Sequence, residues 1–113
     1  MIEKISSESM EQQGFLTWFH LKYPDVLIFH IPNGGFRDIK TATKLRAEGV
    51  VPGVPDLFIP KWKIFIEMKR KKGGVLSADQ TKIINYLERA GYIVIVGYGA
   101  EDASTKLMEV RKS

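Results

Sequence analysis

The sequence predicts an α/β fold in which helices cover both faces of a mixed central sheet. Helical and strand-like segments follow one another in the order α-β-α-β-β-α-β-α, which is typical of layered α/β domains. Residues 60–63 form a connection short enough to join strands at 56–59 and 64–69 as an antiparallel hairpin. Residues 77–90 form a helix of the length that a right-handed crossover between parallel strands needs.

The first predicted helix lies near the start of the chain and ends just before Pro24. Ser9 and Gln12 have the spacing of a capping box. Ser6 or Ser7 offers an earlier start, so the first turn stays open to within a few residues.

A short strand and a polar helix follow the first helix. Residues 26–31 are mostly apolar and end in a Pro-Asn-Gly-Gly loop at 32–35, which predicts a strand. Residues 38–48 predict a second, polar helix, which Gly49 ends. A connector rich in proline and glycine then spans 50–55.

The remaining elements build the hairpin and the crossover. Residues 56–59 and 64–69 predict two strands, and Ser77 caps the crossover helix that Gly91 ends. Residues 92–96 predict the last strand, and 101–111 a weaker terminal helix.

Length and composition indicate one domain that spans residues 1–113. A chain of 113 residues buries about two-thirds of its unfolded surface, which is enough for one core. No apolar run approaches the ~20 residues of a membrane span, and no signal-peptide pattern opens the chain. We therefore expect a cytoplasmic protein.

Charge and cysteine content narrow the chemistry. The absence of cysteine excludes disulfides, thiolate zinc sites and cysteine nucleophiles, and two histidines argue against a site built from several histidines. A net charge of +4 mildly favours a polyanionic partner. The basic run at 69–72 alone would fit a solvated loop, but carboxylates nearby need cations if a phosphate is to approach.

Two carboxylates and a lysine are predicted to converge at one edge of the sheet. Asp56 opens one strand of the hairpin, and Glu67 and Lys69 lie on the other. Because side chains alternate along a strand, Glu67 and Lys69 share a face and stand about 6.6 Å apart. Each feature alone has an ordinary explanation, namely a turn or an exposed charge pair. Their combination favours a catalytic site.

These residue types suit metal-assisted cleavage of a phosphodiester. Magnesium prefers oxygen ligands and keeps several waters, so Asp56, Glu67 and the backbone carbonyl of Met68 would supply a partial shell. The ion would lower the pKa of a bound water, and Lys69 would orient the nucleophile and stabilise the pentacovalent phosphorus.

Two further polar residues have open interpretations. Glu11 precedes Phe15 and Trp18 at helical spacing, which turns a carboxylate toward the core, where a metal or Lys69 would compensate it. Equally, Glu11 fits a solvated first turn near the positive helix end. Gln80 is explained by a capping box with Ser77.

Together these motifs resemble the VRR-NUC family of the PD-(D/E)XK nuclease superfamily. The resemblance spans roughly residues 11–91. It is carried by the segments Asn33-Gly34-Gly35, Gly49-Val50, Gly53-Val54-Pro55-Asp56-Leu57, Glu67-Met68-Lys69, and Leu76-Ser77 with Gln80.

The resemblance implies a restriction-endonuclease-like core that hydrolyses DNA with Mg²⁺, or with Mn²⁺ in its place. It implies that Asp56 and Glu67 are metal ligands and Lys69 the catalytic lysine. Glu11 would be the acid borne on the first helix, and Gln80 a supporting residue.

The resemblance also implies a small stand-alone protein of a phage or bacterium that cuts four-way DNA junctions as a homodimer. A two-fold dimer would place two sites for two symmetric cuts. Residues 107–110 could form an apolar seam, although core packing explains them equally well. The alternatives are a nuclease that processes flaps or ends, and a DNA-binding module with the same fold but no catalysis.

Candidate contacts to nucleic acid are polar or basic residues near the site. They are Asn33, Arg37, Lys61, Lys63, Arg70, Lys71 and Lys72. Trp62 could stack on a base, but an exposed aromatic at a turn is the simpler interpretation. His30 is expected to be a structural histidine rather than a base.

Overall fold

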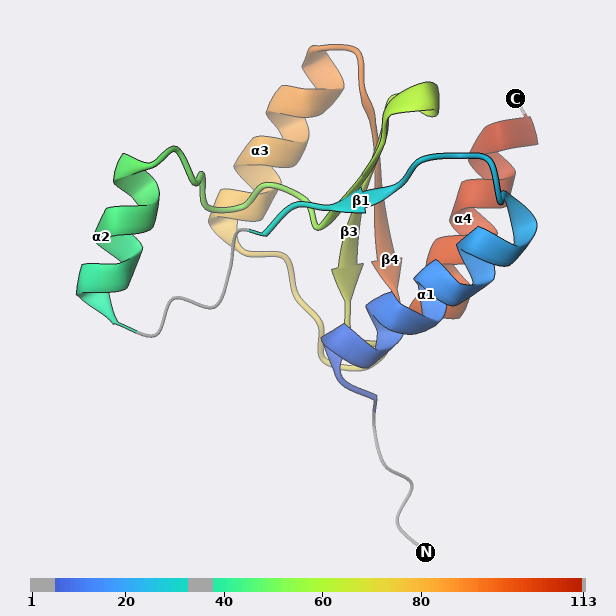
Figure 1. Cartoon of the computed structure of the whole chain (residues 1–113), viewed down its shortest axis with the longest axis horizontal. Coiled ribbons are helices and arrows are strands. Elements are labelled where there is room, and N and C mark those ends of the chain that lie inside the picture. The colour runs from blue at the N-terminus through green and yellow to red at the C-terminus, as the bar shows by residue number, and fades with distance from the viewer. Residues whose placement is uncertain (1–5, 33–37, 113) are drawn as a thin grey trace, which may run out of the picture.

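The computed structural model describes residues 6–32 and 38–112 and confirms the mixed α/β fold (Figure 1). In chain order the elements are α1 (Glu8–Lys22), β1 (Phe29–His30), α2 (Ile39–Ala47), β2 (Leu57–Ile59), the 3₁₀ turn η1 (Pro60–Trp62), β3 (Ile64–Lys69), α3 (Ala78–Arg89), β4 (Ile93–Tyr98) and α4 (Ala100–Lys112).

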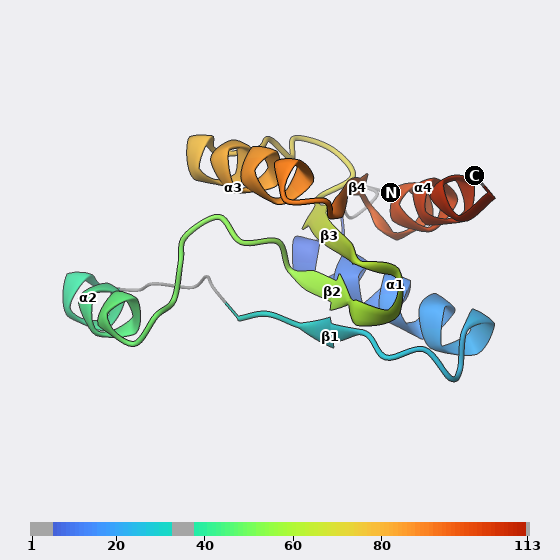
Figure 2. The same cartoon turned by 90° about the horizontal axis from the view of Figure 1, so that it is seen from above.

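The sheet has the order β1-β2-β3-β4 and mixes both strand directions. β2 pairs with β1 and β3 in antiparallel fashion, which confirms the predicted hairpin. β3 and β4 are parallel, and α3 connects them as the predicted crossover. Figure 2 shows α1 and α4 on one side of the sheet and α3 on the other, so helices cover both faces.

Local hydrogen bonds explain where the helices begin. The Ser7 hydroxyl accepts from the backbone N–H of Met10 at 3.1 Å, so α1 starts at the earlier of the predicted positions. Ser9 lies inside the helix. At α3 both bonds of the capping box between Ser77 and Gln80 are present.

β1 is shorter than the strand predicted over 26–31. The backbone N–H of Val26 donates to the carbonyl of Tyr23, so Val26 belongs to the turn after α1 and not to the strand. Only Phe29 and His30 pair with β2 as a strand. β1 is an edge strand of this sheet, where short pairing is common.

The core lies between the sheet and the pair α1 and α4. Ile64, Ile66 and Met68 of β3 are almost fully buried there. Rings from α1 and small or branched side chains from α4 cover them, namely Phe15, Phe19, Ala103 and Leu107. Leu107, considered above for an apolar seam, is therefore a core residue.

Helix α2 stands away from the sheet in both views (Figures 1 and 2). None of its residues is buried, and its N-terminus is capped by Asp38, whose carboxylate accepts from the backbone N–H of Thr41 at 2.7 Å. None of the helices in the described part of the chain is long and apolar enough to cross a membrane.

Candidate metal centre

Three carboxylates meet beside the carboxyl-terminal half of β3. Glu8 from the first turn of α1, Asp56 just before β2 and Glu67 on β3 each place an oxygen within 4.8 Å of the others. Like charges at this separation repel strongly unless a cation or a proton joins them. The group therefore has the donor set and spacing of a site for a hard divalent cation.

Asp56 is fixed from both neighbouring strands. Its Oδ2 accepts from the backbone N–H of Met68 at 2.7 Å, which ties the carboxylate to β3. Its carbonyl accepts from the backbone N–H of Ile31 at 2.7 Å and lies 2.9 Å from Nδ1 of His30. His30 thus holds the backbone of Asp56, in agreement with the structural role expected for it.

The glycine of the Gly-Val-Pro-Asp segment lets this loop touch α3. Gly53 has φ +91°, and a Cβ there would lie 2.5 Å from the carbonyl oxygen of Asp79. Pro55 is fully buried. The loop that delivers Asp56 is therefore packed directly on the first turn of the helix that carries Gln80.

Glu67 is the most constrained of the three acids. Its side chain is 1% exposed. Oε2 accepts from Nε2 of Gln80 at 3.3 Å, whereas Oε1 is buried without a hydrogen-bond partner. An unsatisfied buried carboxylate oxygen is costly, so this atom needs a proton or a cation.

The surroundings of Glu67 favour its neutral form. Burial first, then the adjacent Asp56 and, to a smaller extent, Glu8 together raise the pKa of Glu67 to about 9. The ammonium of Lys69 acts in the opposite direction. A divalent ion would replace the proton, because it neutralises the same cluster more strongly.

Lys69 is a buried cation on the same face as Glu67. Its side chain is 7% exposed, and it lies two residues further along β3. Buried lysines are rare without acidic groups nearby, and the charge of Lys69 acts on the carboxyl of Glu67, whose pKa it lowers.

Gln80 serves the helix cap and the site at once. Its Oε1 accepts from the backbone N–H of Ser77 at 2.9 Å, while its Nε2 donates to Glu67. The capping-box pattern seen in the sequence thus also orients the buried acid.

Glu11 has a different partner from the one considered above. Its Oε1 accepts from the backbone N–H of Ala100 at 2.8 Å, at the first turn of α4. That bond, then a bond from Ser6, then the charge of Lys71 hold the pKa of Glu11 below its usual range. Glu8, one turn earlier on α1, contributes the carboxylate of the cluster instead.

The carbonyl of Met68 faces the cluster side of β3. The N–H and C=O of a strand residue point to the same side, and the Met68 N–H points to Asp56. The next carbonyl, that of Lys69, bonds the N–H of Gly99 toward β4. This arrangement is compatible with the ligand role expected for the Met68 carbonyl.

The expected phosphate contacts divide into two groups. Lys61 and Lys63 are exposed at the start of β3, and Arg70, Lys71 and Lys72 are exposed after its end. The second group lies beside Glu67 and Lys69, whereas the first is separated from them by the length of the strand. Asn33 and Arg37 lie outside the described residues.

Trp62 is engaged inside the protein. The guanidinium of Arg111 lies 3.6 Å from the centroid of its ring, and Tyr23 meets it edge-on at 4.9 Å. These contacts tie η1 to the ends of α1 and α4, so Trp62 is not the freely exposed turn residue considered above.

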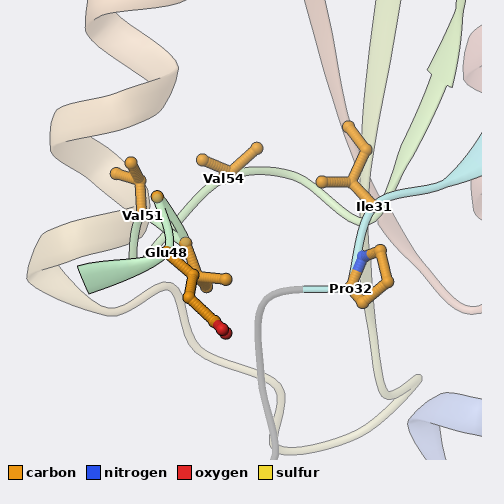
Figure 3. Close-up of a pocket in the computed structure, with 7 residues that line it drawn as sticks. Ile31, Pro32, Glu48, Val51 and Val54 are labelled. Carbon is orange, nitrogen blue, oxygen red and sulfur yellow. The ribbon is translucent and has the colours of Figure 1, made fainter. Parts of the chain in front are cut away.

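A cavity of about 240 Å³ lies apart from the carboxylates (Figure 3). It is lined by Ile31 and Pro32 after β1 and by the segment between α2 and β2, namely Glu48, Gly49, Val50, Val51 and Val54. Its lining is mostly aliphatic and shares no residue with the cluster. The cluster itself lies at the end of β3 and combines the buried Glu67 with the partly buried Glu8 and Asp56.

Comparison with known proteins identifies the fold. The chain resembles a solved structure described as a VRR_NUC domain protein, with a TM-score of 0.78 over 97% of this chain and 92% of that one. The two sequences are 22% identical. No family model and no curated protein matches the sequence. The similarity confirms the fold that the sequence motifs imply.

Proposed function

We propose that this chain is a VRR-NUC nuclease domain over its whole length, and that it hydrolyses DNA with a divalent metal ion. One observation carries the proposal: Oε1 of Glu67 is buried without a partner, among three carboxylates and beside a buried lysine. A purely structural cluster of acids would be destabilising, whereas a metal site needs such groups.

Glu67, Asp56 and Glu8 would hold the ion, together with the carbonyl of Met68. Oxygen-only ligation favours Mg²⁺, and Mn²⁺ would substitute for it. When bound, such an ion lowers the pKa of a water and neutralises charge on a phosphate oxygen.

The chain's own residues supply the remaining functions. The Lys69 ammonium would orient the attacking water and stabilise the negative charge that develops on the phosphate. Gln80 would keep Glu67 in its ligating orientation through the hydrogen bond that it donates to Oε2. Glu11 would act indirectly, by joining α1 to α4 through Ala100 and so holding the helix that carries Glu8.

For the substrate we propose branched DNA, with a four-way junction as the favoured form and a homodimer as the active unit. The net charge of +4 and the exposed basic run at 70–72 beside the cluster support a polyanionic substrate. A two-fold dimer would pair two such sites for symmetric cuts.

A panel of labelled substrates tests this function. Four-way junction, flap, duplex and single strand are incubated with Mg²⁺, with Mn²⁺ and with a chelator. Paired symmetric nicks on the junction, dependent on metal, are expected. Cutting confined to flaps or ends would replace the junction by the alternative substrate, and absence of metal-dependent cutting on every substrate would overturn the proposal.

Two lysine variants provide the matched control. Lys69→Met keeps the buried stem of the side chain but removes the charge, so we expect cleavage to fall by at least ~10²-fold with junction binding largely kept. Lys82→Met removes an exposed charge from α3 and should cut at nearly the normal rate. A folded Lys69→Met protein that cuts normally would exclude the assigned role.

A further inference from the structure

A row of aromatic rings crosses the sheet on the same face as Glu67 and Lys69. Phe29, Phe58 and Phe65 are directly opposite one another on β1, β2 and β3, and Tyr92 joins the row just before β4. Because side chains alternate, Phe65 shares its face of β3 with Glu67. We call these four residues the aromatic row.

The rings of the aromatic row are packed against one another. Phe58 and Phe65 stack at 4.2 Å between centroids with 26° between planes, and Phe29 meets Phe58 edge-on at 5.9 Å. Tyr92 meets Phe65 at 5.3 Å. The row is therefore a preformed surface. Its side chains are already ordered, so a ligand would bind without the entropic cost of immobilising them.

The aromatic row is also accessible. The Phe29 side chain is 43% exposed, and Phe58, Phe65 and Tyr92 are half-buried. The opposite face of β2 and β3 is fully buried under α1 and α4. A contiguous apolar patch that is still open to solvent is typical of an interaction surface.

We propose that unpaired bases of the strand whose phosphate would enter the carboxylate cluster pack on the exposed side of the aromatic row. This inference rests on the proposed function, since it names the form of DNA that the same site prefers. Phe65 lies about 6.6 Å along β3 from Glu67, or about two steps of 3.4 Å along a stacked strand. Bases one or two positions from the scissile phosphate would reach the rings.

Charge and area favour this occupant over a second copy of the chain. A second copy carries the same charge of +4, whereas a nucleic acid strand is anionic. Stable protein interfaces bury about 800 Å² on each partner, and four rings that are mostly half-covered offer much less. Because the faces of Phe58 and Phe65 are turned to each other, a base would lay its face on the exposed ring edges, and this contact needs only one or two bases and tolerates any sequence.

The consequence is a preference for DNA whose bases are already unpaired near the cut. Bases in an intact duplex are stacked on one another, and extracting one costs a few kcal/mol. Branch points and single-stranded segments avoid that cost, so the row would select them without reading their sequence.

Binding in the presence of a chelator tests this without depending on cleavage. The probes are a labelled single-stranded oligodeoxynucleotide and an abasic strand of the same length, measured by fluorescence anisotropy. The wild-type chain should bind the base-bearing strand more tightly. Phe58→Leu and Phe29→Leu should each lose at least about fivefold of that affinity and leave abasic binding unchanged.

Tyr86→Leu is the matched control, because this ring on α3 is 65% exposed and lies outside the row. Thermal melting shows whether each variant is folded, and Phe29→Leu alters the most exposed ring of the row. Equal binding of both probes by the wild type, or equal losses in Tyr86→Leu, would overturn the proposal. So would row variants that change only the oligomeric state.

The outcomes separate this inference from the proposed function. Base-dependent binding without any metal-dependent cleavage would refute the nuclease and leave the stacking surface. Metal-dependent cleavage without base-dependent binding would refute the stacking surface alone.

Discussion

Along β3, Ile64, Ile66 and Met68 point to one face of the sheet, and Phe65, Glu67 and Lys69 point to the other. The first set is buried against α1 and α4 and contains only apolar side chains. In the second set, Glu67 and Lys69 are almost as deeply buried as these apolar residues, and one carboxyl oxygen of Glu67 has no hydrogen-bond partner. The same six residues thus build a satisfied face and an unsatisfied one.

The difference shows how stability and chemistry are divided in this fold. Apolar burial on the first face contributes free energy of folding, at roughly 25 cal/mol per Å². The second face costs free energy, because like charges and a buried carboxyl are held together before any ion binds. Mutations on the two faces should therefore act in opposite directions on stability.

The largest change in stability is expected from Ile66→Ala. Ile66 is fully buried among the core residues, so truncation should lower the free energy of unfolding by about 2–5 kcal/mol. Denaturant unfolding measures this loss. The metal affinity of the folded variant should stay close to that of the wild type. A loss of metal binding without a loss of stability would contradict the division of roles between the two faces.

Gly53→Ala should affect both properties at once. A Cβ at φ +91° and 2.5 Å from the Asp79 carbonyl forces the connector away from α3, at a cost of about 1–3 kcal/mol. Because the same connector delivers Asp56, cleavage should fall as well. Gly49→Ala is the control: it shares a positive φ of 103°, but its Cβ would meet nothing within 4 Å, so cleavage should be kept.

Glu67→Gln should stabilise the metal-free protein and abolish cleavage. The neutral amide keeps an acceptor for Gln80 and, unlike Glu67, does not have to take up a proton on folding, so we expect a gain of about 1–3 kcal/mol near neutral pH. The folded pKa near 9 lies above the ordinary 4.5, so the folded wild type binds more protons between those values. Its stability therefore falls as pH rises through that window.

Melting temperature measured against pH checks this sign. The gap between Glu67→Gln and the wild type should be absent below about pH 4.5 and widen up to about pH 9. Saturating Mg²⁺ should raise the melting temperature of the wild type and not that of the variant. A variant less stable than the metal-free wild type throughout would contradict the account.

The smallest effects separate the two acids of α1. Glu11→Gln should cost about 0.5–2 kcal/mol, because the charge bonded to Ala100 at the start of α4 is lost, while metal affinity stays unchanged. The pKa of Glu11 is lowered, so its contribution to stability is present above the ordinary value and disappears as pH falls through the folded pKa.

Glu8→Gln is the counterpart on the same helix. We expect weaker metal binding with little change in the free energy of unfolding, since Glu8 is the carboxylate that α1 contributes to the cluster. Calorimetric titration and denaturant unfolding of both variants compare the two acids directly. Loss of metal affinity in Glu11→Gln and not in Glu8→Gln would reverse the assignment.

Most of the fold was predictable from the sequence because local signals were strong. Ser77 with Gln80 marked the start of α3, and the alternation over 64–69 marked β3 and its two faces. β1 was predicted too long, because the use of Val26 in a turn leaves no trace in hydrophobic pattern.

The site was predictable only in part. The alternation of β3 placed Glu67 and Lys69 on one face, as the structure has them. Glu8 and Glu11 are one turn apart and share a helix face, so periodicity could not tell which acid meets the cluster. Which acid meets the cluster depends on where α4 begins, because the backbone N–H of Ala100, far along the chain, donates to the carboxylate of Glu11. The aromatic row likewise depends on strand register, which pairs Phe29 with Phe58 and Phe58 with Phe65.

Titration of Mg²⁺ and Mn²⁺ into the wild type and into Glu67→Gln by calorimetry tests the central claim most directly. Saturable binding that strengthens with pH is expected for the wild type, because the ion must displace the proton of Glu67, and no binding at that site is expected for the variant. Failure of the wild type to bind either ion, or equal binding by the variant, would contradict a metal centre at Glu8, Asp56 and Glu67.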